Sequence, residues 1–301
     1  MTAAPPEDVL RWVVAAVDPA ARVEEVTGLR EGGAPWLVRL TGGRDVVLRS
    51  GGPDDGASLA TEVAALELLT SAALPTPRLL GVEMSGQVGP GHLAVVTSRL
   101  PGTSRCSGPP PLSRFAALGT AAAAVHAVPA PAPSAALPHR DRTLPSVDFA
   151  ALRRAAPAQP LLQEAEAALA ALPTPSGSPV LVHGDLWQGN TLWDGDSLTG
   201  VIDWDCAGVG LPGIDVGSLR CDAAVTRGPD AAQAVLAAWE RAMGRVLEDG
   251  AYWDLVAGLA TPPDMAWFVT AIRDQGRVDL DGPTMLARRD AFLVAALERL
   301  S

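Results

Sequence analysis

The spacing of hydrophobic and polar positions divides the chain into a strand-rich first third and a mainly helical remainder. An apolar stripe at helical spacing near the start predicts a short helix, and apolar runs between glycine-rich turns predict strands. The elements expected in this part are helices over 7–17 and from Ser58, as N-cap, to about 73, and strands over 23–27, 36–40, 45–50, 79–82 and 93–98.

Beyond residue 100 the apolar positions recur mostly at helical spacing. Helices are expected over 112–128, within 148–172 and towards the end of the chain, with a short strand at 180–182 and a hairpin that pairs 191–193 with 198–203. This order predicts an α+β fold with two lobes. Residues 1–100 would form a small antiparallel sheet with one helix, and residues 101–301 a larger, mainly helical lobe. A ligand is expected in a cleft between them.

Composition and charge narrow the class of protein. Of the 301 residues, 48% are hydrophobic and 19% charged, as in a soluble globular protein. A net charge of −11 disfavours nucleic acid as a partner. No apolar run approaches the roughly 18 residues of a membrane span, and the first residues lack the pattern of a secretory signal, so a cytoplasmic location is expected. Three widely spaced cysteines indicate neither a disulfide framework nor a zinc site.

The most informative segment runs from His183 to Asn190 and is followed, after a gap, by Ile202 and Asp203. Phosphoryl transfer needs a carboxylate that accepts the proton of the attacking hydroxyl, together with oxygen ligands for magnesium. Asp185 fits the first role, and Asn190 and Asp203 fit the second. Any one of these residues alone would be read as an ordinary turn or strand-end residue; the combination favours the chemistry. His183 is expected to brace backbone carbonyls rather than to act as the base.

A predicted hairpin supports the magnesium site. Its turn lies at residues 194–197, and its midpoint falls between Asp196 and Ser197. Closed there, the hairpin would place Asn190 opposite Asp203, about 5 Å apart across the paired strands.

These motifs resemble the aminoglycoside phosphotransferase family of antibiotic and small-molecule kinases. The resemblance rests on His183-Gly184-Asp185 with Asn190, on Ile202-Asp203-Trp204 and on the segment 210–217, and it extends over the chain from about residue 20. It implies a protein-kinase-like fold with Asp185 as catalytic base and with Mg²⁺ on Asn190 and Asp203. By the same resemblance Asp215 braces the catalytic loop, a simple helix cap being the alternative, and the backbone near Ser98 and Leu100 meets the purine of ATP or GTP.

The first lobe departs from the family pattern because the chain contains no lysine. Arg49, at the end of the third predicted strand, takes the place of the usual phosphate-binding lysine; the alternative is a surface arginine. An arginine can grip two phosphate oxygens at once. Its expected partner is Glu62 on the apolar face of the next helix, with Glu67 as second choice. The turn 28–34 could cover phosphates or be an ordinary hairpin turn.

The expected activity is transfer of the γ-phosphoryl of ATP or GTP to a hydroxyl of a small molecule. Only eleven residues separate Asp203 from Asp215, and none is Ser, Thr or Tyr, which disfavours a protein kinase with an activation loop. The favoured acceptor is an antibiotic such as an aminoglycoside, a tuberactinomycin or a nucleoside antibiotic such as capuramycin, with resistance or self-protection as the result. The acceptor itself and the oligomeric state are not predicted.

Three alternatives remain open at this point. The first is a kinase for a metabolite such as choline or homoserine, and the second is a nucleotide-binding pseudokinase without turnover. The third is a metal-dependent hydrolase, which would bind a transition metal; its candidate residues are His183, Asp185, Asp203 and Asp205.

Overall fold

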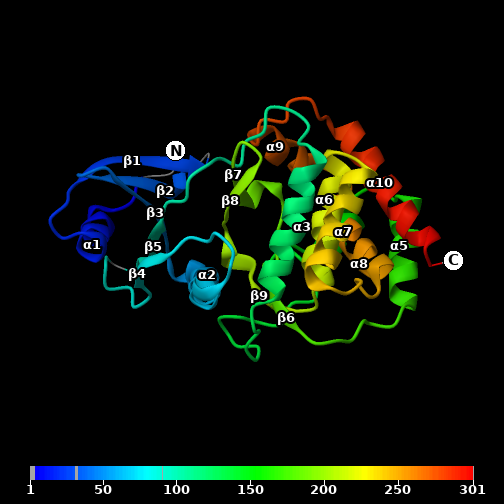
Figure 1. Cartoon of the computed structure of the whole chain (residues 1–301), viewed down its shortest axis with the longest axis horizontal. Helices are drawn as coiled ribbons and strands as arrows, with labels where there is room; N and C mark the ends of the chain where they lie inside the picture. Colours follow the sequence, from blue (N-terminus) through cyan, green and yellow to red (C-terminus); the bar gives the residue numbers. More distant parts are fainter. Residues whose placement is uncertain (1–3, 31–32, 90, 301) are drawn as a thin grey trace.

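A computed structural model of the protein describes residues 4–30, 33–89 and 91–300. The strands of the first third form one five-stranded antiparallel sheet in the order β1-β2-β3-β5-β4 (Figure 1). The strands are β1 Val23–Arg30, β2 Gly33–Leu40, β3 Arg44–Gly51, β4 Leu79–Glu83 and β5 Leu93–Ser98, and the helices beside them are α1 Glu7–Val17 and α2 Gly56–Leu68. This part therefore has the predicted composition of a small sheet with one helix after the third strand.

The two helices cover opposite faces of the sheet. Val46 and Leu48 of β3 are buried in a cluster with Val9 and Val13 of α1. Side chains alternate between the faces of a strand, so Arg49 projects from the other face, towards α2. The buried part of α2 packs there, with Leu59 against β5. The alternation thus places Arg49 between the sheet and α2, the helix that carries its predicted partner Glu62.

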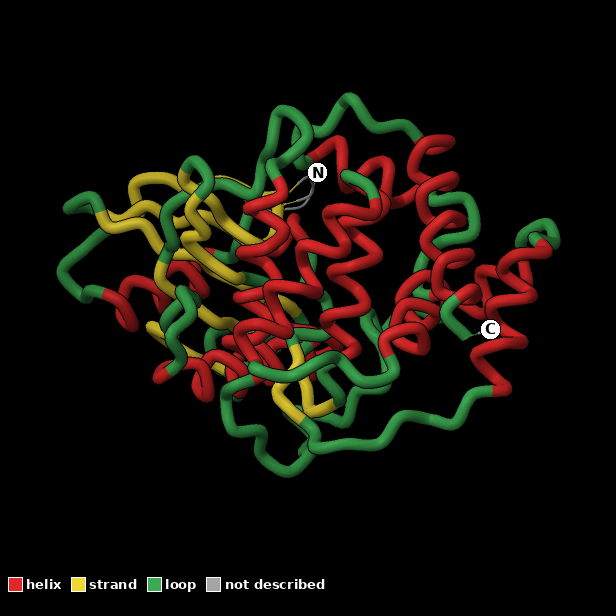
Figure 2. Tube along the Cα trace, turned by 45° about the vertical axis from the view of Figure 1, so that its right-hand side comes forward, coloured by secondary structure: helices red, strands yellow, loops and turns green. Residues whose placement is uncertain are grey.

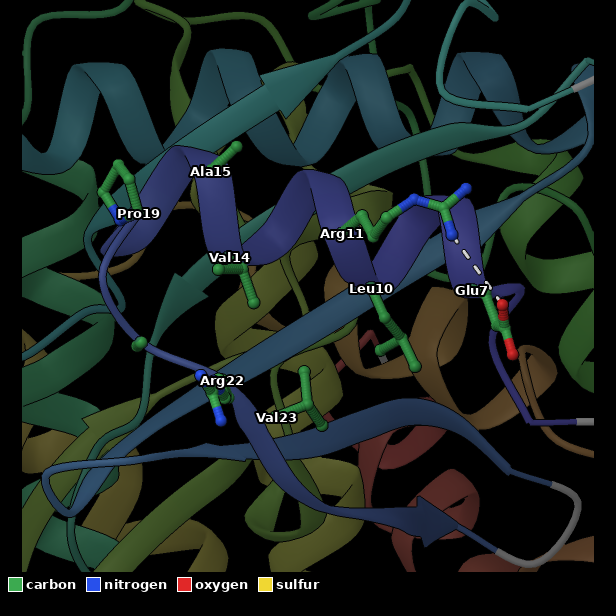
Figure 3. Close-up of a pocket in the computed structure, with 9 residues that line it drawn as sticks. Glu7, Leu10, Arg11, Val14, Ala15, Pro19, Arg22 and Val23 are labelled. Carbon is green, nitrogen blue, oxygen red and sulfur yellow. Dashed lines mark ion pairs between the residues drawn. The ribbon is translucent and has the colours of Figure 1, made fainter.

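A hollow of about 500 Å³ lies between α1 and β1 (Figure 3). Leu10, Val14 and Val23 line it, and the pair of Arg11 and Glu7 borders one end. Because α1 covers the face opposite to Arg49, this hollow is not part of the site described below.

The remainder of the chain is mainly helical, and most of its helices pack together away from the strands of the sheet (Figure 2). The helices are α3 Leu112–His126, α4 Phe149–Ala155, α5 Pro160–Ala171, α6 Gly213–Thr226, α7 Pro229–Met243, α8 Gly250–Leu259, α9 Ala266–Asp274 and α10 Gly282–Glu298. Helix α6 is buried along its length except at Ser218, and it contacts α3, α7, α8 and α10. It is the central element around which this part of the chain is built.

Two short antiparallel strand pairs also belong to this part of the chain. They are β6 Val180–Val182 with β9 Gly208–Gly210, and β7 Thr191–Asp194 with β8 Ser197–Val201. The fold is that of the protein-kinase-like α+β class, as predicted.

Both predicted boundaries of the second helix are wrong. Helix α2 begins at Gly56 with Asp55 in the N-cap position, so Ser58 lies inside the first turn. The Ser58 hydroxyl donates a hydrogen bond to the Asp55 carbonyl at 2.9 Å and does not cap the helix. The helix also ends earlier than expected, at Leu68, and a 3-10 turn at 69–71 follows it.

Candidate active site

The loop after β6 is anchored at its start by Asp215 of α6. The amides of His183 and Gly184 donate hydrogen bonds to the two Asp215 oxygens at 2.8 and 2.9 Å. His126 lies 3.1 Å from the same carboxylate, and Trp239 donates to the other nitrogen of His126 at 2.9 Å. Because Trp239 occupies Nδ1, the hydrogen of His126 sits on Nε2 and is donated to Asp215. The carboxylate therefore receives three donors in a fully buried position.

The pKa of Asp215 reflects this surrounding. Burial alone would raise it, but the hydrogen bonds that His126 and the amide of His183 donate outweigh the burial and lower the pKa of Asp215 below its usual value. The predicted bracing contact of Asp215 with the loop is present. His126 and Trp239, which fix that contact, were not predicted.

Asp185 and Asn190 are joined within the loop. The Asn190 amide nitrogen donates to the Asp185 carbonyl and to its carboxylate, each at 2.9 Å. With the nitrogen used in this way, the Asn190 oxygen is the atom through which it would bind a cation. Gly184, at φ +78°, turns the chain just before Asp185, and its α-carbon faces the Cys206 carbonyl so closely that a side chain would clash.

His183 braces the backbone, as expected. Its Nδ1 accepts a hydrogen bond from the Asp185 amide at 3.3 Å, so the ring hydrogen sits on Nε2, which lies 3.0 Å from the Ile202 carbonyl. Both ring nitrogens are thus committed to backbone groups. A metal bound by His183, as the hydrolase interpretation requires, does not fit this arrangement.

The hairpin brings Asn190 and Asp203 to the same end of β7 and β8, but not in the predicted register. The turn closes at Gly195-Asp196, and a bulge lies between Leu192 and Trp193. Together they place Asn190 opposite Ile202, whose amide donates to the Asn190 carbonyl at 2.9 Å. Asp203 is therefore not directly opposite Asn190. It follows one residue later in a left-handed conformation, φ 68°, and leads the chain into a 3-10 turn at 204–206.

Arg49 meets carboxylates from both parts of the chain. Its Nη1 lies 3.2 Å from Glu62 Oε2 and 2.9 Å from Asp203 Oδ1, and its Nη2 lies 2.8 Å from Asp205 Oδ2. The predicted pair of Arg49 and Glu62 is confirmed, whereas Glu67 is exposed. Glu62 Oε2 accepts no well-aligned hydrogen bond from the described residues, and burial raises the pKa of Glu62 to about 7.

The donor set fits a magnesium ion that also binds a nucleotide. Among the described residues no group of three or more His, Cys, Asp or Glu side chains could hold a metal ion by itself. Mg²⁺ is commonly held by one or two protein oxygens together with substrate phosphates. Asp185, Asp203 and Asp205 outweigh the single charge of Arg49, so the site has negative charge left for a divalent cation.

Ser98 and Leu100 lie where β5 leaves the sheet. The Ser98 amide donates to the Arg78 carbonyl at 2.8 Å, and its hydroxyl accepts from the Arg78 amide at 2.9 Å. The Ser98 amide is therefore used beside the sheet, and a purine contact of the backbone near Ser98 and Leu100 stays a prediction. The turn 28–34 includes residues 31 and 32, which lie outside the described residues.

A second aspartate of α6, Asp222, reaches the far end of the loop. It lies seven residues after Asp215, on the same helix face, and accepts a hydrogen bond from the Gln188 amide. Its Oδ2 is buried without a hydrogen-bond partner among the described residues. Burial raises the pKa of Asp222 to about 7, against the opposing effects of that amide and of Arg277. The seven-residue spacing from Asp215 places Asp222 on the same helix face, but its contact with the loop was not predicted from the sequence.

Residues 25–248 match the family model of the phosphotransferase enzyme family APH. The chain belongs to this family. Comparison with curated protein sequences finds no match. Among solved structures, the chain resembles macrolide 2'-phosphotransferase MphH from Brachybacterium faecium, with 21% identity and a TM-score of 0.62, over 96% of this chain and 98% of that one.

Two further solved structures show the same fold. A putative aminoglycoside phosphotransferase from Ralstonia eutropha has 14% identity and a TM-score of 0.66. A thermostable mutant of aminoglycoside phosphotransferase APH(4)-Ia, in a ternary complex with ADP and hygromycin B, has 19% identity and a TM-score of 0.59. Each alignment covers 96% of this chain and 98% of the other. The protein is thus a phosphotransferase, and the hydrolase interpretation is wrong.

In this phosphotransferase the segment between Asp203 and Asp215 is short and fully built into the fold. It forms the 3-10 turn 204–206, strand β9 and the start of α6. Arg140 holds its backbone by hydrogen bonds to the Cys206 and Ala207 carbonyls. No helix in the described part of the chain is long and apolar enough to cross a bilayer.

Proposed function

We propose that this phosphotransferase transfers the γ-phosphoryl group of ATP or GTP to a hydroxyl of an antibiotic. One observation carries the proposal: Asp185, Asn190 and Asp203 gather at the end of one hairpin, and Arg49 reaches Asp203 from the sheet. Solved structures of similar fold include complexes of APH(4)-Ia with ADP or AMP-PNP and hygromycin B. A nucleotide and a hydroxylated antibiotic are therefore the partners that these relatives support.

In the proposed reaction the acceptor oxygen forms a bond to the γ-phosphorus while the bond to the bridging β-phosphate oxygen breaks. The Asp185 carboxylate accepts the hydroxyl proton, and Asn190 holds that carboxylate in place. Arg49 directs its guanidinium at phosphate oxygens. Asn190 and Asp203 would hold Mg²⁺, which when bound supplies positive charge opposite the phosphates.

We assign nucleotide binding and acceptor binding to different parts of the chain. Residues 1–100 would bind the nucleotide, and residues 101–301 would supply the catalytic loop and bind the acceptor, in a cytoplasmic enzyme. Two acidic side chains that could have recognised a cationic acceptor are paired with arginines instead. Asp254 pairs with Arg220 and Arg299, and Asp279 pairs with Arg277. Acceptor recognition therefore falls to other residues of the helical part.

The proposal is tested by incubating the protein with Mg²⁺, ATP or GTP and a panel of hydroxylated antibiotics, followed by mass spectrometry. We expect one acceptor to gain a single phosphoryl group. Asp185→Asn, which keeps the size of the side chain but cannot take the proton, should lower kcat by a factor of roughly 10²–10⁴ and leave nucleotide affinity nearly unchanged. Nucleotide binding without turnover on any acceptor, choline and homoserine included, would support a pseudokinase instead.

A further inference from the structure

Asp205 is a partner of Arg49 that the proposed reaction does not use. It lies in the 3-10 turn after Asp203, more than 150 positions from Arg49 in the sequence, and its Oδ2 is 2.8 Å from Arg49 Nη2. Both side chains are about three-quarters buried, with 26% of Asp205 and 23% of Arg49 exposed. The pair is thus partly shielded from water, where a charge-assisted hydrogen bond is stronger than at the surface.

The carboxylates are divided between the two terminal nitrogens of the guanidinium. Glu62 and Asp203 both approach Nη1, whereas Asp205 approaches Nη2. A planar guanidinium has two such edges, so it can be held on one edge while the other faces a ligand. A lysine ammonium is a single nitrogen and cannot be held in this divided way. The arrangement therefore depends on the arginine that stands in this chain at position 49.

We propose that Asp205 is a positioning residue for Arg49. It holds the Nη2 edge, so that Nη1 stays directed at the nucleotide phosphates when Asp203 turns to the metal ion. This inference rests on the proposed function, because it assumes that the Arg49 edge near Asp203 faces a nucleotide. Holding the long side chain in one orientation before binding removes part of the ordering cost of the complex.

The turn that carries Asp205 does not need this carboxylate for its own shape. The Trp204 indole donates to the Val201 carbonyl at 3.1 Å, and the Ala207 amide donates to the Trp204 carbonyl at 3.1 Å. Arg140 holds the carbonyls of Cys206 and Ala207 from the other side. The Cys206 thiol also hydrogen-bonds to Asp205, a contact that an asparagine can keep. We therefore expect Asp205→Asn to fold like the parent protein.

The test is a double-mutant cycle with Asp205→Asn, Arg49→Lys and the double variant, in which calorimetry measures the affinity for Mg²⁺ and AMP-PNP. Asp205→Asn should weaken binding about tenfold, or about 1.4 kcal/mol. In the Arg49→Lys background the same change should cost less than about threefold, since one ammonium cannot be held on two edges. The KM for nucleotide should rise in parallel while kcat falls much less.

Two control variants distinguish the effect of a carboxylate at position 205 from the effect of removing a negative charge elsewhere in the protein. Asp205→Glu keeps a carboxylate and should bind better than Asp205→Asn. Glu166→Gln removes one charge from a similar pair with Arg153, remote from the site, and should leave affinity unchanged. Parent-like affinity in Asp205→Asn, equal losses in Asp205→Asn and Asp205→Glu, or an undiminished loss in the Arg49→Lys background would each overturn the inference. Failure of the parent protein to bind nucleotide would instead overturn the proposed function, and the inference with it.

Discussion

At the scale of single residues, Asp215 and Asp222 show how surroundings decide ionisation. Both belong to α6, and both are buried against the same loop. Asp215 accepts hydrogen bonds from two amides and His126, and its pKa is lowered. Asp222 has the Gln188 amide and an unpartnered Oδ2 among the described residues, and its pKa is raised to about 7. One carboxylate is therefore a charged anchor, and the other holds a proton up to neutral pH.

The raised pKa of Asp222 predicts a pH dependence of stability. Between its ordinary value of 3.8 and about 7 the folded state binds more protons than the unfolded state. The free energy of unfolding should therefore fall as pH rises through this window, by up to about 1.4 kcal/mol per pH unit from this group, and change no further above it. Asp222→Asn removes the titration. Urea unfolding at several pH values should show a flatter profile for this variant than for the parent.

Glu62 contributes in the same direction, because burial also raises its pKa to about 7. The unfolding free energy of Asp222→Asn will therefore still depend on pH, and the test compares its slope with that of the parent protein. Asp196→Asn, at the exposed turn of the hairpin, serves as the matched control and should keep the slope of the parent. An Asp222→Asn profile that coincides with the parent would show that Asp222 is ionised normally in the folded protein.

At the scale of elements, the shape of the loop 183–190, which we propose to be catalytic, depends on the close approach of two turns. The loop 183–190 bends at Gly184, whose α-carbon lies against the Cys206 carbonyl in the turn that carries Asp203 and Asp205. Gly184 has a positive φ, and there is no room for a side chain on its α-carbon. This contact, more than either turn alone, sets how near Asp185 lies to the end of the hairpin where we propose that magnesium binds.

Gly184→Ala should therefore lower both stability and activity. The left-handed backbone costs about 1 kcal/mol for alanine, and the clash with Cys206 adds to it, so we expect a loss of roughly 2–4 kcal/mol in the free energy of unfolding. Gly195→Ala is the control, since Gly195 has φ +56° but open space around it. It should lose about 1 kcal/mol and retain its kcat. Equal losses in the two variants, measured by urea unfolding and steady-state kinetics, would contradict the role of the contact.

The sequence predicts these elements where the signal is local. The strands, α2 and the loop follow from apolar spacing, glycines and the His183–Asn190 motif, and the inward position of Glu62 follows from helical periodicity. The hairpin register does not follow, because a bulge at Leu192 leaves no mark in the pattern. The contact between His126 and Trp239 could not be predicted from the sequence for a different reason. They lie 113 positions apart, and only the packing of α3 against α7 joins them.

At the scale of the whole molecule, one arginine links the sheet to the helical part. Arg49 comes from β3, and two of its three carboxylate partners follow the hairpin β7–β8. A nucleotide bound at this junction would contact both parts of the chain. Ligand binding and overall stability should therefore be coupled.

We expect nucleotide to stabilise the protein only together with magnesium. At a nucleotide concentration 100 times its Kd, the free energy of unfolding should rise by about 2.7 kcal/mol. Chelation of the metal with EDTA should remove most of this gain, because Asn190 and Asp203 then have no cation to share with the phosphates. EDTA without nucleotide should leave the unfolding midpoint unchanged. Equal stabilisation with and without Mg²⁺ would argue against the assigned metal ligands.

Helix α6 has a further consequence for how such an enzyme can evolve. Because Asp215 and Asp222 hold both ends of the loop 183–190 to one buried helix, a substitution that shifts α6 would displace the whole loop at once. We expect a lineage with this fold to vary at exposed positions of the outer helices while the residues that α6 presents to the loop stay the same.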